Sequence, residues 1–434
     1  MVVNTLCRLP HGRSARILSS LTLGALILSS NAFGWGTEDQ RKQIFDRIAG
    51  VPPSESEMTA MDAAGSAAEA AQVALDSPYF YDVTLKNMVT PWTNEEQTVF
   101  APLNDYTATV IGLVRDKADF RSVLYTDQVY VAKSSYRDAS NNPLPAYSLA
   151  NNSHYEEIED LMDRGNSLFD ILTPTTQTLP AGARAGVMST RAAGRAFFSA
   201  GTNRAMLRFT LINHLCMDLE QFKDTSLPAD RIRQDVSRSP GGDSSIFLNN
   251  CIGCHSGMDP LVQAFAYYDF DYGGDDTNIE NGTLVYNSAG TVDPDTVSLL
   301  DGSPNLSRVS DPNVLYRVQD KYFINFTNFP YGYVTNSDQW TNYWREGRNS
   351  GVEWNAGGES PGASGIGAGS LGRELANSQA FAQCHVKRVF KTVCLRDPDS
   401  AADANEITNL TTSFMGSGYH LDEVFASAAA YCVE

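Results

Sequence analysis

The sequence is poor in basic residues, in cysteine and in long apolar runs. It has 32 Lys and Arg against 51 Asp and Glu in 434 residues, which gives a formal net charge of −19. Such an acidic chain repels the phosphates of nucleic acids and of anionic membranes, so we expect neither as a partner. After residue 34, no stretch approaches the 18 consecutive apolar residues of a membrane span. With 42% hydrophobic residues, the chain is nevertheless typical of a folded globular protein.

The first 34 residues have the pattern of a secretory signal peptide. Arg8, Arg13 and Arg16 precede an apolar run, Ile17 to Ser29, and small residues follow at Ala32-Phe33-Gly34. The run is too short and too rich in Ser and Gly for a typical membrane span, although a retained anchor is the alternative. We therefore expect an exported chain without residues 1–34 and without membrane insertion. Its net charge would be −22, because three arginines and no acids are removed.

Two of the seven cysteines form a specific motif. Cys251-Ile252-Gly253-Cys254-His255 has the spacing of c-type haem attachment. The two thiols can each add to one haem vinyl group, and the adjacent histidine then faces the iron as its proximal ligand. A thioredoxin-like site would need a βαβ pattern nearby, and a structural zinc site would need a second Cys/His pair at matching spacing. Neither is evident, so we expect one haem c on Cys251 and Cys254, with His255 as the metal ligand.

The other four cysteines of the exported chain predict disulfide bonds, because export places them in an oxidising compartment. Cys384 and Cys394 fall on one predicted helix, Ser378 to Leu395. Ten residues of helix span about 15 Å, which exceeds the roughly 7 Å between Cα atoms that a disulfide can bridge. Each should therefore pair elsewhere, with Cys216 and Cys432 as the available partners. Free buried thiols are the alternative.

The sixth iron ligand has several candidates. Met258 is only three residues after His255, which places it on the same side of the haem and disfavours it. We slightly favour Met415, because Gly416 and Gly418 would let the chain approach the haem closely. The other candidates are Met188, His214, His385 and His420. A Met ligand would raise the reduction potential relative to a second His, and an empty position would admit small molecules.

Apolar spacing predicts a mainly α fold, with an N-terminal helical domain at 35–235 and a cytochrome c-like haem domain at 236–434. The predicted helices begin at a capping box, Thr37-x-x-Gln40, and include Met58 to Leu75, Gly201 to Leu219, Ser378 to Leu395 and His420 to Cys432. Another helix should begin at Asn104 or Asp105.

Three segments read as loops, and a fourth as a small hairpin. Residues 134–152, 172–185 and 347–370 are rich in Gly, Pro or polar residues, and a small hairpin is predicted within 279–300. Gly367-x-Gly369-x-x-Gly372 matches a dinucleotide-binding fingerprint, but no apolar strand precedes it, so we interpret it as loop.

Several stretches resemble large exported bacterial proteins with planctomycete-type cytochrome c domains. The likeness is clearest from Asn250 to Leu261, where the haem motif is followed by an Asp-Pro-Leu turn. Leu371 to Arg396 and Phe414 to Phe425 are similar to the C-terminal part of that family, and Asp119 to Tyr125 and Arg184 to Val187 match more weakly. The resemblance implies haem c binding and electron transfer, and it implies no substrate.

These observations predict an exported electron carrier, periplasmic or extracellular, whose haem is enclosed by Phe247, Leu261 and Phe265. Its partner would be a redox protein. A basic partner is compatible with the acidic surface, and the alternative is that this surface serves solubility alone. A haem oxidase or peroxidase with an open distal site, or a redox-sensing binding protein, would also fit the motif. No arrangement of nucleophile, base and acid stands out, so we predict no catalytic residue.

Overall fold

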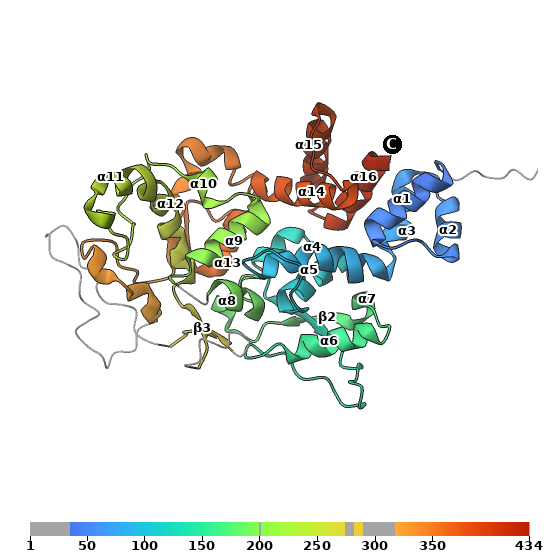
Figure 1. Cartoon of the computed structure of the whole chain (residues 1–434), viewed down its shortest axis with the longest axis horizontal. Coiled ribbons are helices and arrows are strands. Elements are labelled where there is room, and N and C mark those ends of the chain that lie inside the picture. Colours follow the sequence, from blue (N-terminus) through green and yellow to red (C-terminus); the bar gives the residue numbers. More distant parts are fainter. Residues whose placement is uncertain (1–34, 199–200, 274–281, 290–316, 434) are drawn as a thin grey trace, which may run out of the picture. The chain divides into compact units, whose positions relative to one another are not determined.

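The computed structural model describes residues 35–198, 201–273, 282–289 and 317–433, and in these the protein is mainly helical, as predicted (Figure 1). The signal peptide predicted at 1–34 lies outside the described residues. Residues Gly34–Glu434 form one compact unit. No helix in the described ranges is long and apolar enough to cross a membrane.

The described segments contain the following helices and strands. The helices in the first half are α1 (Glu38–Ala49), α2 (Glu55–Asp62), α3 (Ala67–Leu75), α4 (Lys86–Val89), α5 (Asp105–Arg115), α6 (Ser153–Asp163), α7 (Leu168–Ile171), α8 (Arg191–Phe197), α9 (Arg204–Leu215) and α10 (Leu219–Phe222). Those in the second half are α11 (Ser244–Ile246), α12 (Ile252–Val262), α13 (Gly367–Ala376), α14 (Gln379–Cys394), α15 (Ala401–Gly416) and α16 (Leu421–Val433). The strands are β1 (Gln128–Ala132), β2 (Leu172–Thr176), β3 (Tyr268–Asp271), β4 (Thr283–Tyr286), β5 (Gln339–Thr341) and β6 (Ser364–Ile366).

Helix-capping residues explain where several helices begin. The Thr37 side chain caps α1 and the Gln40 side chain closes the predicted capping box. Asn104 caps α5 through the backbone N–H of Thr107. The continuous helix predicted from Met58 to Leu75 is wrong, because Ser66 caps a new helix, α3, after the break that follows α2.

The strands form three antiparallel pairs, β1 with β2, β3 with β4 and β5 with β6. Gln128 faces Thr176 at one end of the first pair, and Ala132 faces Leu172 at the other. Strand β2 lies in the segment 172–185 that was predicted to be loop, so that prediction is wrong there. A small hairpin was predicted within 279–300. The strand that the structure describes in this segment is β4, and it pairs with β3, which precedes the segment.

The glycine fingerprint also differs from its interpretation as loop, because Gly367 begins helix α13. A Cβ at Gly372 would lie 1.9 Å from the main-chain oxygen of Leu124, and one at Gly369 would lie 2.9 Å from that of Arg184. These glycines let α13 pack directly against neighbouring backbone. Their spacing is thus explained by close packing.

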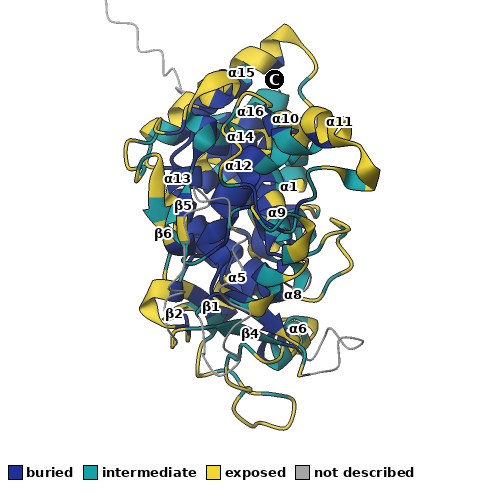
Figure 2. Ribbon diagram, turned by 90° about the vertical axis from the view of Figure 1, so that its left-hand side faces the viewer, coloured by how far each residue is buried: buried dark blue, intermediate teal, exposed yellow. Residues whose placement is uncertain are grey.

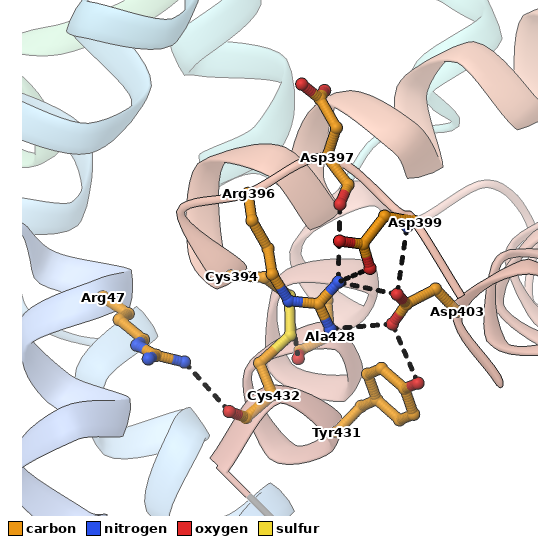
Figure 3. Close-up of a disulfide and its surroundings, with 9 residues drawn as sticks. All are labelled: Arg47, Cys394, Arg396, Asp397, Asp399, Asp403, Ala428, Tyr431 and Cys432. Atoms are coloured by element: carbon orange, nitrogen blue, oxygen red, sulfur yellow. Dashed lines mark hydrogen bonds and ion pairs between the residues drawn. A yellow bond between two sulfur atoms is a disulfide. The ribbon is translucent and has the colours of Figure 1, made fainter.

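Two disulfides are present, as predicted, and one links α14 to the end of α9 while the other links α14 to α16. Cys216 pairs with Cys384, with 5.2 Å between Cα atoms, and Cys394 pairs with Cys432 at 5.5 Å. Around the second disulfide, Arg47 donates a hydrogen bond to the carbonyl of Cys432, so that α1 contacts α16 (Figure 3). The main hydrophobic cluster draws residues from both sides of the boundary predicted at 235/236.

Candidate haem-attachment site

The Cys-x-x-Cys-His motif lies on helix α12 and on the π-helical turn η6 (Phe247–Cys251) before it. Cys254 and His255 follow Cys251 by three and four residues, so the three side chains share one helical face. They are partly exposed, whereas Gly253 and every residue from Ser256 to Val262 are buried. The motif is therefore the accessible part of a helix that is otherwise enclosed.

The opposite face of α12 is fixed by an aromatic contact. Gly257 lies two residues after His255, roughly 200° around the helix. A Cβ there would lie 1.9 Å from Nε1 of the buried Trp344, which stacks on Phe222 with 4.4 Å between ring centroids. Because only glycine fits against this indole, the helix can lie close to it with His255 directed away.

His255 has a carboxylate partner on the same helix. Its Nδ1 lies 3.1 Å from Oδ1 of Asp259, one turn further along, and the Asp259 side chain is fully buried. Arg204 of α9 binds both oxygens of Asp259, with its Nε 2.8 Å from Oδ1 and its Nη2 3.0 Å from Oδ2. The imidazole is thus held at Nδ1, which leaves Nε2 as the nitrogen available to a metal.

Arg204 also connects Asp259 to a second carboxylate. Its Nη1 and Nη2 lie 2.6 and 3.0 Å from the two oxygens of Asp235. Burial alone would raise the pKa of Asp259, but the charge of Arg204 and the hydrogen bonds from Arg204 and His255 hold that pKa well below its usual value. Burial likewise opposes the ionisation of Asp235, and Arg204 lowers its pKa below the usual value. Both carboxylates therefore stay ionised in the fold.

Cys251 and Cys254 are the only described cysteines outside the two disulfides. The Cys254 thiol lies 3.8 Å from the carbonyl oxygen of Leu219, and burial raises its pKa above the usual value. Two neighbouring thiols that are unpaired while four others form disulfides are available for another covalent bond.

Apolar side chains surround the first of these thiols. Cys251 and Ile252 pack against a small cluster of Ile232, Val236 and Phe247, separate from the main core. On the same stretch of helix Ile246 and Leu248 are 41% and 56% exposed, and Figure 2 shows α11 as an exposed element. Exposed apolar groups beside unpaired thiols fit an apolar cofactor. Leu261 and Phe265, also predicted to enclose it, belong to the main cluster.

The five candidates for the sixth ligand have other contacts in the structure. His214 and His385 contact each other, with 3.3 Å between Nδ1 and Nε2, and His420 lies 3.6 Å from Glu423. Met188 is buried beside Gly372 of α13, and Met415 is on α15, which packs on α14 and α16. Among the described residues, no hydrogen bond or ring contact joins any of the five to His255.

The sequence predictions missed Arg204, Asp235 and Asp259. Asp259 carried a signal, since a carboxylate four residues after a helical histidine lies on the same face. Arg204 and Asp235 carried none, because they are 55 and 24 residues distant from Asp259 in the chain.

Within the part of the chain that the structure describes, no group of three or more His, Cys, Asp or Glu is arranged to hold a bare metal ion. Comparisons with protein-family models, with curated proteins and with solved structures find no match.

Proposed function

We propose that this chain is an exported monohaem c-type cytochrome, which holds haem c through Cys251, Cys254 and His255 and exchanges electrons with a redox protein. One observation carries the proposal. The two described cysteines outside disulfides share the accessible face of an otherwise buried helix with a histidine whose Nε2 is available. The likeness of Asn250 to Leu261 to planctomycete-type cytochrome c domains supports the same function.

The chain's own groups would act as follows. Cys251 and Cys254 would each hold the haem through a thioether, the product of adding the thiol S–H across one vinyl group. His255 would provide Nε2 to the iron while Asp259 holds Nδ1. The haem, when bound, supplies reversible one-electron chemistry. Export rests on the signal-peptide pattern of residues 1–34, and the two disulfides are in keeping with it.

The test is an absorption spectrum of the full chain, made in a host that attaches haem c, in its oxidised and reduced states. We expect a pigment that acidified acetone does not extract, with a low-spin spectrum in both states. A high-spin spectrum that changes on addition of cyanide, carbon monoxide or peroxide would instead favour a haem oxidase or peroxidase. A colourless protein, or one whose pigment is extracted, would contradict the proposal.

Variants make the assignment specific. Replacing both Cys251 and Cys254 by Ala should abolish covalent pigment, and His255→Ala should remove the low-spin spectrum. His420→Ala is a matched control, because that histidine is also partly exposed and lies near a carboxylate one helical turn away, Glu423. It should leave the spectrum unchanged. Equal spectra for His255→Ala and His420→Ala would contradict the assigned ligand.

A further inference from the structure

We propose that Asp259 is a positioning residue for the iron ligand. By accepting a hydrogen bond from Nδ1 of His255, it directs Nε2 towards the haem and makes the imidazole a stronger electron donor, which lowers the reduction potential. This inference rests on the proposed function. It concerns how the chain sets the driving force of electron transfer.

The protonation pattern follows from the contacts of Asp259. Arg204 has only donors and binds both oxygens of Asp259, so this carboxyl group acts as an acceptor and the hydrogen between it and His255 is on Nδ1. Nε2 of a neutral imidazole then carries the free lone pair that a metal needs. A ligating histidine whose other nitrogen donates to a carboxylate is oriented by it and is more basic. Greater electron donation stabilises the ferric state, and this lowers the potential.

The carboxylate is held rigidly, so the hydrogen bond can set an orientation. Besides His255, Asp259 accepts from Nε and Nη2 of Arg204, and its Oδ2 also lies 3.2 Å from the backbone nitrogen of Arg233. Both oxygens are thus occupied in a fully buried site. A buried carboxylate without Arg204 would be uncompensated and costly, so the arginine makes this arrangement possible.

A comparison with Asp235 distinguishes two causes of a shift in the reduction potential. Asp235 has the same charge as Asp259 and binds the same arginine, at 2.6 and 3.0 Å. In the described part of the chain, it makes no hydrogen bond to His255. If only the electric field of the cluster matters, neutralising either carboxylate should shift the potential similarly. If the hydrogen bond matters, Asp259 should have the larger effect.

The experiment is a spectroelectrochemical titration of the haem-loaded full chain and of three variants. Asp259→Asn should raise the ratio of ferrous to ferric haem at a fixed potential about tenfold, which is about 59 mV for one electron. Asp235→Asn should produce less than half of that shift. Glu374→Gln, which removes a fully buried carboxylate bound by Arg345 at 2.8 Å, should produce none. Equal shifts for Asp259→Asn and Asp235→Asn, or no shift for Asp259→Asn, would overturn the inference.

A measurement on the unmodified chain covers the case in which Asp259→Asn does not fold. With ¹⁵N-labelled histidine, the reduced protein should show an Nδ1-bound proton on the iron ligand that exchanges slowly with water. A ligand histidine without such a proton, or one exchanging as fast as an exposed imidazole, would overturn the inference and leave the proposed function intact. An unmodified chain that carries no covalent haem would overturn both.

Discussion

Acid should destabilise the fold through His214 and His385. Each is only 1% exposed. His214 on α9 lies 3.3 Å from His385 on α14, and its Nε2 lies 2.8 Å from the hydroxyl of Tyr106 on α5. Nδ1 of His385 has no hydrogen-bond partner among the described residues. Arg388, on α14, is the cation near the pair. An imidazolium in either position would be desolvated beside a cation.

The magnitude follows from the pKa of His214. Burial, and to a smaller extent the charge of Arg388, lowers this pKa from 6.5 to about 3, and burial with His214 and Arg388 lowers that of His385 well below 6.5. Below pH 6.5 the unfolded chain therefore binds more protons than the folded one. Stability falls as the pH falls from about 6.5 towards 3. For His214 alone, the loss between pH 7 and pH 5 is about 2 kcal/mol. His385 acts in the same direction.

The assay is urea unfolding at pH 7 and at pH 5 for three chains. His214→Gln keeps a polar group in place but cannot take up a proton in this range. We expect the unmodified chain to lose about 2 kcal/mol more than His214→Gln between the two pH values. His420→Gln, which removes a partly exposed histidine, should behave like the unmodified chain. Equal losses of stability on acidification for His214→Gln and the unmodified chain would contradict this role of His214.

Two further predictions concern the fold. Gly372→Ala should cost about 3 kcal/mol or prevent folding, because its Cβ would lie 1.9 Å from the main-chain oxygen of Leu124. Gly416→Ala, where a Cβ meets nothing within 4 Å, should be neutral or slightly stabilising, and thermal unfolding compares the two. Removing the Cys216–Cys384 disulfide, which closes a 168-residue separation, should cost about 5 kcal/mol on chain entropy. A denaturation midpoint unchanged by replacing both cysteines would contradict this last estimate.

Local signals predicted much of the fold. Ser378 and Leu395, the ends expected for one helix, are the caps of α14. Since this helix separates Cys384 from Cys394, its length excluded that pairing, and the structure contains two other pairs. Local signals were weaker where tertiary packing determines the conformation of a segment. The glycines of α13 read as loop, because their use is close contact with the backbone of Leu124, far away in the sequence.

The candidate site was predictable only in its local part. Cys251, Cys254 and His255 are identified by spacing alone, since three groups within five residues must lie together. Asp259 is one helical turn away and was within reach of the same argument. Arg204 is brought to Asp259 by the packing of α9 against α12, and periodic patterns in the sequence do not predict such a contact.

We propose that this chain is joined covalently to one haem at a single helical motif. Mass spectrometry of the denatured full chain, followed by mapping of its proteolytic peptides, tests this attachment. We expect a chain heavier by the mass of one haem, with that mass on the peptide containing Cys251 and Cys254. A chain of unmodified mass, or haem mass on any other peptide, would contradict it.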